Sequence, residues 1–508
     1  QNQSSAASDV YKRQDKSLIK FFGDNEPFSF AKNLEGEIYR KYENRTTKRF
    51  KNFQKSYFLK FHGPVGWAEI FKNLIQLKTP VVGALREYEA LSHLDKNQIQ
   101  APQIKGFGNK GLNPANSFSF LITEELYETI SLEDFFLEGL HKQLSPTQKR
   151  KLIESTADLI RRMHLSGLNH RDLYLCHLHI KKEINFDNIE IYLIDLHRAQ
   201  IRSEVPERWL VKDLGGFFHS ILQFNLSEKD FYRFMMSYYQ CSLRELIKNH
   251  QNLITKILRR SFSMYLNPLL KDFSLRSSKK ISENSPYLKK VEQSHRWISK
   301  RNIQIESFMK LFSDESLLLK SGEVIKNEKG HLIVKVRVLD QNYYIKKYRI
   351  KGFLHGVSRL FKRTRAYNSW ISSHWINALG VRTAEPVLLF ENNGILGAKT
   401  SYFVTEEVLG KRLDKALEQD INIDFVTSKI QAFFKRMGWV ELRHGDAKTA
   451  NFFIDHKGLV VFDLDIAGKG FSSFFNKRAI YRDKMRILRS FDDINEVQSK
   501  LSKRLLRS

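Results

Sequence analysis

The sequence predicts an α+β protein in which one domain occurs twice in tandem, and four observations support this fold class. Of the 508 residues, 42% are hydrophobic and 12% aromatic, which is enough apolar surface for packed cores. This length corresponds to two or three domains of roughly 100–200 residues each. One set of motifs occurs twice in the same order. The chain also has only 25 Gly and 10 Pro, which argues against a disordered or fibrous protein.

The repeated motifs have a constant spacing. An Arg-Met pair is followed by a His-x-Asp tripeptide in two places, and the second copy lies 274 residues after the first. The first copy consists of Arg162, Met163, His170 and Asp172, and the second of Arg436, Met437, His444 and Asp446. Two such arrangements in the same order indicate a duplicated domain.

A helix is predicted before each tripeptide, because the apolar residues there follow the helical period. The first helix is expected to begin at Ser145-Pro146 and to stop at Gly167. The second is expected to begin behind Asp424 and to stop at Gly438.

A strand with a single lysine precedes each helix, and a β-rich run that ends in an aspartate follows each tripeptide. The lysines are Lys60 and Lys346, and the aspartates are Asp195 and Asp463. Both copies therefore have the order strand lysine, helix, His-x-Asp loop, strand aspartate.

These copies set the expected domain boundaries. We expect the first domain at residues 18–270, a basic linker at 271–315 and the second domain at 316–508, because the residues between the copies have linker chemistry. Residues 1–14 are polar and contain no apolar segment of a secretory signal. Residues 1–17 are therefore predicted to be a disordered or non-native tail.

Two observations indicate a cytoplasmic protein. No stretch approaches the roughly 18 apolar residues that a membrane helix needs. The two cysteines, Cys176 and Cys241, cannot build a disulfide framework or a cysteine-rich zinc site, which fits a reducing compartment.

The chain is strongly basic, with 84 Lys and Arg against 56 Asp and Glu and a formal net charge of +28. Such an excess predicts an anionic partner. Residues 241–310 hold 15 basic and 5 acidic residues, so this region is either a solvated helical linker or a polybasic segment on an anionic membrane. Nucleic acid is not expected, because no zinc-finger spacing or RNA-recognition motif is present. The lysines expected at the membrane are Lys279, Lys280, Lys289 and Lys290.

The order of the motifs is typical of phosphoryl transfer from a nucleotide. Catalysis of this reaction is mostly positioning and electrostatic neutralisation, because charge is spread over the phosphoryl oxygens. A strand lysine binds the nucleotide phosphates, a loop aspartate accepts the proton of the attacking hydroxyl, and a strand-end aspartate holds magnesium. A polar residue five positions after the catalytic aspartate completes the metal site.

In the first domain these roles fall to Lys60, Asp172 and Asp195, with His177 at the position where an asparagine is usual. Glu87 opens a helical segment and is the expected ion-pair partner of Lys60. From its neighbours alone, His177 is either a metal ligand or a packed histidine.

In the second domain the same roles fall to Lys346 for the phosphates, Asp446 as base, and Asn451 and Asp463 for the metal. Downstream of each copy, an aspartate is expected beneath the catalytic loop, and these aspartates are Asp213 and Asp483. Neither domain has a G-x-G-x-x-G loop, so phosphate binding by such a loop is not supported.

Two stretches of the first domain are more specific than a general kinase pattern. Residues 168–177 read LNHRDLYLCH, and residues 194–200 read IDLHRAQ. With shorter motifs at 35–37, 45–47, 57–60, 111–114 and 130–134, they closely resemble the lipopolysaccharide core heptose(I) kinase family. The resemblance covers roughly residues 20–260.

This resemblance implies a protein-kinase-like bilobal fold, so with the duplication we expect two tandem domains of this kind joined by a basic helical linker. It also implies ATP as donor, Mg²⁺, and a lipid A-core glycolipid as acceptor, with the first heptose of the inner core as the phosphorylated sugar. The reaction is then expected on the cytoplasmic face of the inner membrane of a Gram-negative bacterium. By this match Lys60 binds phosphate, Asp172 is the base and Asp195 binds magnesium, and members of the family carry a histidine where this chain has His177.

The second domain is similar to the broader group of lipopolysaccharide sugar kinases through residues 443–448, Asn451 and residues 461–465. It departs from that group at Ala366, which aligns with Glu87, so Lys346 is expected to lack its glutamate. Kdo or a second heptose are the expected acceptors. The alternatives are a single-activity heptose kinase with a pseudokinase docking domain, and an aminoglycoside-type small-molecule kinase. The sequence does not decide the oligomeric state.

Overall fold

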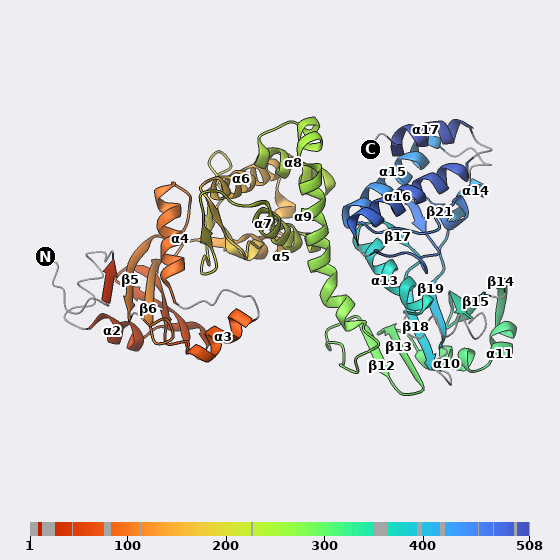
Figure 1. The fold of residues 1–508 in the computed structure, drawn as a ribbon, viewed down its shortest axis with the longest axis horizontal. Coiled ribbons are helices and arrows are strands. Elements are labelled where there is room, and N and C mark those ends of the chain that lie inside the picture. The colour runs from red at the N-terminus through yellow and green to blue at the C-terminus, as the bar shows by residue number, and fades with distance from the viewer. Residues whose placement is uncertain are drawn as a thin grey trace. The chain divides into compact units, whose positions relative to one another are not determined.

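Figure 1 shows the structure, a computed structural model. It describes residues 9–12, 26–42, 44–75, 83–111, 113–224, 227–328, 330–349, 363–393, 399–416, 422–455, 457–470, 472–491 and 495–506. The chain divides into two compact units, Gln1–Ser261 and Phe262–Ser508. Each unit contains helices and strands. No helix within the described residues is both long enough and apolar enough to span a bilayer.

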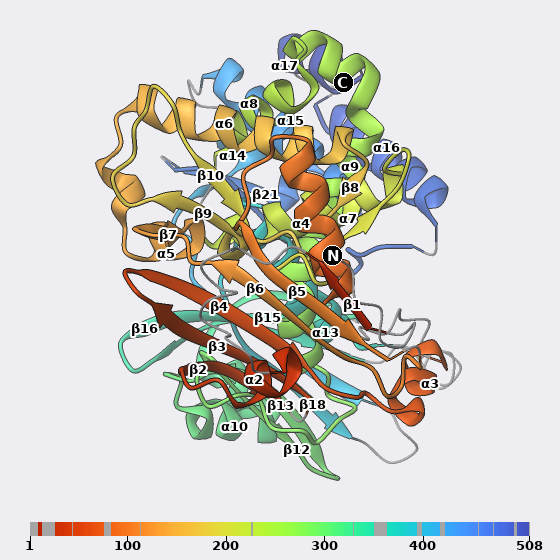
Figure 2. The same cartoon turned by 90° about the vertical axis from the view of Figure 1, so that its left-hand side faces the viewer.

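The first unit begins with a six-stranded antiparallel sheet in the order β1-β5-β6-β4-β3-β2 (Figure 2). Its strands are β1 (Asp9–Lys12), β2 (Glu37–Tyr42), β3 (Arg45–Asn52), β4 (Lys55–His62), β5 (Ile104–Lys110) and β6 (Phe118–Glu124). Side chains of β4 alternate between the two faces, so Tyr57 and Leu59 are buried in the core while Lys60 lies on the opposite face. Helix α2 (Pro27–Asn33) packs Phe28 against this core.

Two more helices accompany this sheet, α3 (Trp67–Ile75) and α4 (Leu85–Lys96). The rest of the unit is mainly helical, with α5 (Leu132–Leu137), α6 (Pro146–Leu165), α7 (Glu207–Ile221) and α8 (Glu228–Tyr239), followed by α9 (Leu243–Asp272) across the division. Five short strands form two small sheets, namely β7 (Thr129–Ser131), β9 (Leu178–Lys181) and β10 (Ile191–Leu193) in one, and β8 (Leu168–Asn169) and β11 (Gln200–Ile201) in the other.

Both predicted ends of the first helix are confirmed by α6. Ser145 caps its N-terminus in a capping box with Gln148, and Pro146 is the first helical residue. Gly167 follows the helix with a φ of +88°, a left-handed conformation that glycine adopts without strain.

The second unit contains a seven-stranded antiparallel sheet in the order β12-β13-β18-β19-β16-β15-β14. Its strands are β12 (Tyr287–Val291), β13 (His295–Lys300), β14 (Gly322–Glu328), β15 (His331–Val338), β16 (Gln341–Tyr348), β18 (Pro386–Asn393) and β19 (Lys399–Glu406). The run β14-β15-β16-β19-β18 has the same order as β2-β3-β4-β6-β5 of the first unit. Strand β16, which carries Lys346, also repeats the burial pattern of β4.

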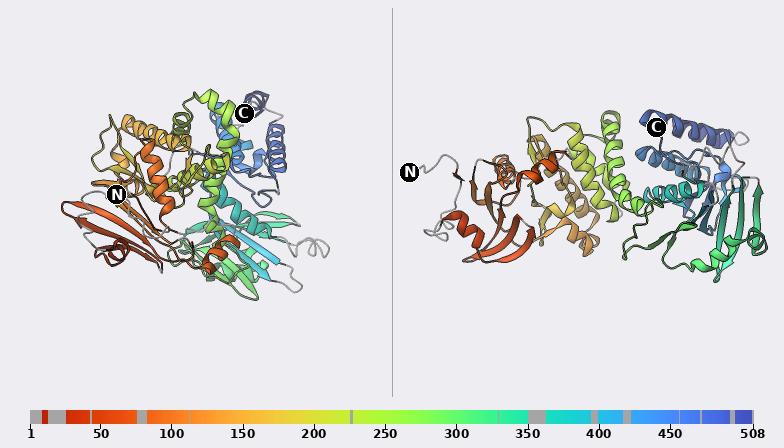
Figure 3. Two further views of the ribbon diagram at one scale, coloured as in Figure 1. Left: turned by 60° about the vertical axis from the view of Figure 1, so that its left-hand side comes forward. Right: turned by 60° about the horizontal axis from the view of Figure 1, so that its bottom comes forward.

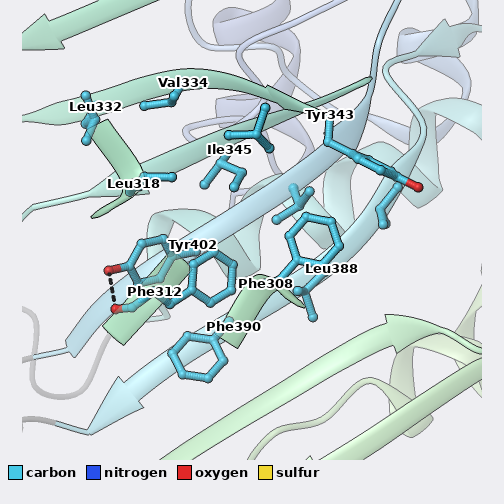
Figure 4. Packing of buried hydrophobic residues seen from close by; sticks show 13 residues of the cluster. Phe308, Phe312, Leu318, Leu332, Val334, Tyr343, Ile345, Leu388, Phe390 and Tyr402 are labelled. Atoms are coloured by element: carbon cyan, nitrogen blue, oxygen red, sulfur yellow. Dashed lines mark hydrogen bonds between the residues drawn. The ribbon is translucent and has the colours of Figure 1, made fainter. Parts of the chain in front are cut away.

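Two short helices, α10 (Ile305–Ser313) and α11 (Glu315–Lys320), cover one face of this sheet (Figure 4). Phe308 and Phe312 of α10 and Leu318 of α11 pack against buried strand residues, and the Tyr402 hydroxyl donates to the Phe312 carbonyl at 3.3 Å. The strand residues of this cluster are Leu332, Val334, Val336, Tyr343, Ile345, Val387, Leu388, Phe390, Tyr402 and Val404.

The rest of the second unit is built on a four-stranded sheet, β17-β22-β21-β20. Its strands are β17 (Arg382–Thr383), β20 (Lys411–Arg412), β21 (Phe452–Asp455) and β22 (Gly458–Val461). The helices are α13 (Arg365–Ala378), α14 (Leu413–Ala416), α15 (Ile423–Val440), α16 (Ser473–Arg489) and α17 (Asn495–Leu506), and the last three are blue in both views of Figure 3.

The predicted stop at Gly438 is wrong. Helix α15 continues through this glycine to Val440 and ends at Glu441, whose φ of +55° is left-handed. Glycine lowers helix stability by roughly 1 kcal/mol but does not by itself end a helix. The left-handed residue that caps the helix lies three positions further on.

Two segments expected to be irregular or helical contain strands. In the predicted tail, β1 pairs with β5, while residues 1–8 and 13–17 lie outside the described residues. In the predicted linker, β13 pairs with both β12 and β18, so residues 287–300 are sheet instead of the expected helix. The reason is that Ile298 of β13 is fully buried in the core on one face of this sheet, which a solvated linker residue is not.

Candidate active sites

Lys60 lies at the centre of an ion-pair network in the first unit. Its Nζ is 2.5 Å from Oε1 of Glu87 and 3.3 Å from Oδ1 of Asp195. Glu87 belongs to the first turn of α4 and is only 3% exposed. The predicted partner of Lys60 is therefore in contact with it, and two carboxylates fix the lysine from different elements.

Asp195 follows β10 and has a φ of +59°. This left-handed conformation is uncommon for a residue with a side chain and often occurs at functional sites. The His197 Nδ1 is 2.8 Å from Oδ1 of Asp195. Burial raises the pKa of this carboxyl, but opposing effects, of which the hydrogen bond from His197 and the charge of Lys60 are the largest, hold the pKa well below its usual range. Asp195 is therefore ionised at neutral pH.

The first His-x-Asp loop is held by Asp213 of α7, which is fully buried. The backbone N–H groups of His170 and Arg171 each donate to an Asp213 oxygen at 2.7 Å. The His170 side chain donates from Nε2 to the carbonyl of Ile194 at 3.0 Å. The loop is thus tied to α7 on one side and to the residue before Asp195 on the other, and Asp213 lies where the sequence placed it.

Asp172 points at the guanidinium of Arg198, whose Nη1 is 3.2 and 2.9 Å from its two carboxylate oxygens. Nδ1 of His177 is 2.7 Å from the carbonyl oxygen of Asp172. Because a carbonyl can only accept, Nδ1 carries the proton, and in the neutral ring Nε2 keeps a free lone pair. This Nε2 is 3.7 Å from Oδ2 of Asp195. His177 is therefore a packed residue that still presents a ligand atom.

The second unit arranges its lysine differently. Lys346 forms an ion pair with Asp463, and Ala366, which aligns with Glu87, is fully buried and apolar. Arg365 of α13 pairs with the buried Asp465, two residues after Asp463. The lysine has therefore lost the glutamate, as the sequence predicted, but it does have a carboxylate partner.

The charges of this site favour the ionised forms of both partners. Burial lowers the pKa of Lys346, but Tyr348, Asp463 and Asp465 together raise it above its ordinary value. Burial raises the pKa of Asp463, but the charge and hydrogen bond of Lys346, together with the charges of His444 and Arg365, lower it below its ordinary value. Asp463 has a φ of +58°, close to that of Asp195.

The second His-x-Asp loop repeats the supports of the first. Oδ2 of Asp483 accepts from the backbone N–H groups of His444 and Gly445 at 2.8 and 2.9 Å. The Asn451 amide donates from Nδ2 to the Asp446 carbonyl at 2.7 Å, and Lys448 Nζ is 3.0 Å from Oδ2 of Asp446. Because Nδ2 of Asn451 is the donor, its Oδ1 is left as an acceptor.

The fit of a divalent cation follows from these donor sets. Each loop leaves one acceptor atom, which is Nε2 of His177 in the first unit and Oδ1 of Asn451 in the second. The backbone carbonyls of these two residues accept from the N–H groups of Ile194 and Phe462, each of which directly precedes an ionised aspartate. Among the described residues, no three His, Cys, Asp or Glu side chains are grouped to hold a metal alone. A magnesium ion at either site would thus need further oxygen ligands from phosphate or water, which is how Mg²⁺ usually binds.

Known proteins are similar to the first unit. A family model described as the lipopolysaccharide kinase (Kdo/WaaP) family matches residues 30–238. Lipopolysaccharide core heptose(I) kinase WaaP of Escherichia coli strain K12 is 44% identical over 239 residues, which are 47% of this chain and 90% of that protein. The chain belongs to this family. The protein of the same description from Pseudomonas aeruginosa PAO1 is 36% identical over 248 residues, 48% of this chain and 92% of that protein.

A solved structure described as WaaP in complex with acyl carrier protein is 30% identical to this chain. The match covers 50% of this chain and 99% of the solved chain, with a TM-score of 0.44. Membership of the Kdo/WaaP family confirms the predicted resemblance, and with it an ATP-dependent kinase. Residues beyond 238, including the whole second unit, lie outside the family match.

The structure brings together every residue that the sequence placed at the first site, namely Lys60, Glu87, Asp172, His177 and Asp195. Sequence reasoning missed the contacts of His197 with Asp195, of Arg198 with Asp172, and of Asp465 with Arg365. All three lie within three residues of a strand-end aspartate, which was the available signal. Their partners depend on how the loop turns after the left-handed aspartate.

Proposed function

We propose that the first unit transfers the γ-phosphoryl group of ATP to heptose I of the lipopolysaccharide core. One observation carries the proposal: Lys60, Asp172, His177 and Asp195 form a single site in the part of the chain that matches proteins named heptose(I) kinases. In this arrangement, Lys60 binds the phosphates while Glu87 and Asp195 hold its ammonium group in place.

Asp172 accepts the proton of the attacking sugar hydroxyl. Arg198 holds both carboxylate oxygens of Asp172, so this side chain has one orientation before the acceptor arrives. His170 and Asp213 fix the loop backbone, which keeps Asp172 at a constant distance from Asp195. The protein thus supplies positioning and charge, which is what phosphoryl transfer requires.

Asp195 and His177 are the proposed magnesium ligands of the first unit, and Asp463 and Asn451 those of the second. Mg²⁺ bound there neutralises negative charge on the phosphates. The low pKa of Asp195 and the free Nε2 of His177 support this assignment, because metal ligands must be deprotonated.

The proposal is tested by mass spectrometry of core oligosaccharide from cells that lack this protein. We expect one phosphate to be missing from heptose I, and its return when the full chain is supplied. Purified protein, incubated with ATP, Mg²⁺ and dephosphorylated core glycolipid, should restore the same phosphate. An unchanged phosphate pattern in the deleted cells contradicts the assignment.

The second unit is proposed to be a second kinase-like domain that acts on Kdo or a second heptose. Its sheet order, its left-handed Asp463 and its Asn451–Asp446 hydrogen bond support this proposal. A pseudokinase docking domain is the competing function, favoured by the missing glutamate at Ala366. The aminoglycoside-type alternative has no support in the first unit, whose matched relatives are named as heptose kinases. The division at residue 261 also supports two domains, although it differs from the expected boundaries of 270 and 316.

The chain is proposed to act in the cytoplasm at an anionic inner-membrane surface of a Gram-negative bacterium. Of the four lysines expected there, Lys279 and Lys280 are exposed, whereas Lys289 donates to the Ser274 carbonyl and Lys290 pairs with Glu292. An apolar row on α3 also supports this proposal, because Trp67, Phe71 and Ile75 are 50%, 55% and 82% exposed at helical spacing.

Vesicle binding tests this location. Changing Lys279 and Lys280 to Gln should weaken binding to anionic vesicles by on the order of 1 kcal/mol per charge, with a smaller loss at high salt. Changing Lys289 and Lys290 should have little effect, because both already have partners. Equal binding to neutral and anionic vesicles argues against the proposal.

A further inference from the structure

Trp209 of α7 is surrounded by positive charge. Four cationic groups lie 5.0–5.4 Å from the centre of its ring. They belong to Arg171, Arg202, Arg208 and Lys212, and we call these four residues with Trp209 the Trp209 cluster. Arg171 is the residue directly before Asp172, so the cluster adjoins the proposed catalytic base.

The cations of the Trp209 cluster form no ion pair within the described residues. None of its four cations has a carboxylate within 4.0 Å among the described residues, whereas nearby Arg198 is paired with Asp172. Nε of Arg171 and Nε1 of Trp209 are buried and have no hydrogen-bond partner in this part of the chain. The ring itself provides only a modest attraction for each cation.

The charged neighbours of Arg171 and Lys212 also shift the pKa values of these two residues. Burial and the charges of Arg198, Arg86 and Arg202 lower the pKa of Arg171 against the opposing effect of Asp172. Burial and the charges of Arg171 and Arg198 lower the pKa of Lys212 against the opposing effects of Asp172 and Asp213. Like charges that are partly removed from water destabilise one another unless an anion joins them.

The second unit offers a comparison, because both loops are held by an equivalent aspartate. Counting back from Asp213 and Asp483, the position of Trp209 is taken by Ala479, which is buried. The position of Arg171 is taken by Gly445, counting by the 274-residue offset. By the count from the two aspartates, Arg478 and Arg482 take the positions of Arg208 and Lys212, so the second unit keeps two basic residues and the loop support but lacks the ring and the arginine beside the loop aspartate.

We propose that the Trp209 cluster binds an anionic group, a carboxylate or a phosphate, that the acceptor carries close to the hydroxyl to be phosphorylated. This inference rests on the proposed function of the first unit and adds the charge of its acceptor. A sugar hydroxyl alone is neutral and does not balance four cations. Arginine forks and a lysine beside an aromatic ring are well suited to carboxylate and phosphate oxygens. An anion held there places the neighbouring hydroxyl at Asp172.

The test compares the KM for acceptor with the KM for ATP in the full chain. Arg208→Gln combined with Lys212→Gln should raise the KM for core glycolipid roughly tenfold, since a charge-assisted hydrogen bond contributes about that factor. The KM for ATP should not change. Arg150→Gln with Lys151→Gln, which removes two charges from the exposed face of α6, is the matched control and should leave both constants unchanged.

Modified acceptors identify the anion. In one arm the carboxylates of the glycolipid are esterified, and in the other its existing phosphates are removed. One treatment should raise the KM of the unmodified enzyme by the same factor and have no further effect on the double variant. Arg208→Lys with Lys212→Arg retains both charges and should restore the KM. The proposal is overturned if neither treatment of the glycolipid changes the KM. It is also overturned if the double variant lowers the unfolding temperature but leaves the KM for core glycolipid unchanged.

Binding without turnover separates this inference from the proposed function. Calorimetric titration of the full chain with core glycolipid measures the affinity that the Trp209 cluster contributes, even if no phosphate is transferred to heptose. Absence of transfer with intact, cluster-dependent binding contradicts only the proposed function. Normal transfer with binding that is equal in the double variant contradicts only the role of the Trp209 cluster.

Discussion

Arg162 of the first unit donates to the carbonyl of Gln98 at 3.2 Å, and Arg436 of the second donates to the carbonyl of Gly380 at 2.6 Å. Both acceptor residues have a left-handed φ, +55° and +68°. Similar pairs occur deeper in each unit, where Ser220 accepts from the N–H of Leu175 and Ser490 from that of Thr449. The residues that hold the His-x-Asp loop are thus nearly the same in the two units.

The residues around the substrate positions differ instead. Glu87 corresponds to Ala366, and His197, two residues after the strand aspartate, corresponds to Asp465. The lysine is therefore held by a helix glutamate and an aspartate in one unit, and by the strand aspartate in the other. The comparison teaches that the scaffold of the site was kept while its charge pattern changed. Under the proposed function, this difference would let the two units take different acceptors.

The largest expected effect comes from the loop aspartates. Asp172→Asn removes the proposed proton acceptor and should lower phosphorylation of heptose I by roughly 10²–10⁴-fold. Asp446→Asn should remove a different phosphate from the core, because its loop is intact. The phosphate pattern of extracted core, measured by mass spectrometry, separates the variants. If Asp446→Asn leaves the pattern unchanged, the second unit is not catalytic.

The loop supports should matter equally in both units. Asp213→Ala leaves two buried N–H groups without an acceptor and should lower the free energy of unfolding by about 2–4 kcal/mol. Asp483→Ala should cost a similar amount. Calorimetry of the two variants measures these losses. A loss below about 1 kcal/mol in only one of them would break the equivalence of the two supports.

A buried histidine should make the second unit sensitive to acid. Burial, and to a lesser degree the charge of Lys300, lower the pKa of His374 to about 3. In the unfolded chain this pKa is about 6.5, so the unfolded state binds more protons between these values, and stability falls as pH drops through this window. At pH 5 the loss relative to neutral pH is roughly 2 kcal/mol.

His374→Phe should remove this part of the acid sensitivity, which denaturant unfolding at pH 7.5 and 5.0 would measure. The first unit is the internal control, because His62 has a pKa also lowered to about 3, by burial and the charges of Arg45 and Lys60. Its acid response should persist in the His374 variant. An unchanged response of the second unit would show that other groups govern its titration.

The smallest effect concerns the lysine partners. Glu87→Gln keeps the size of the side chain but removes one charge from Lys60, which still has Asp195. We expect roughly a tenfold loss in kcat/KM for ATP at the first unit. Ala366→Gly, at the equivalent position, should leave the second unit's nucleotide affinity unchanged. A similar loss in both variants would mean that the effect of Glu87→Gln comes from a change in its helix and not from the lost ion pair with Lys60.

The sequence predicted the parts of these sites that depend on local order. The strand lysines, the loops and the strand aspartates follow from periodicity and spacing, and α6 ends where its capping residues indicated. Partners across loops were harder to predict, because Arg198 reaches Asp172 only through the path of the chain after Asp195. Gly36 and Gly322 are isolated glycines for which the sequence indicates no role. In the fold each of them passes so close to a backbone carbonyl of the next strand that a Cβ would overlap it.

The two strands β12 and β13 have a practical consequence for anyone who separates the units. They continue the second sheet past β18, and β13 supplies the hydrogen bonds along one side of that strand. A fragment cut at residue 316 would lose both strands and leave β18, which carries the apolar Leu388, Leu389 and Phe390, as a bare edge. Exposed edges of this kind recruit strands from other molecules and lead to aggregation. A soluble second unit should therefore begin before Tyr287.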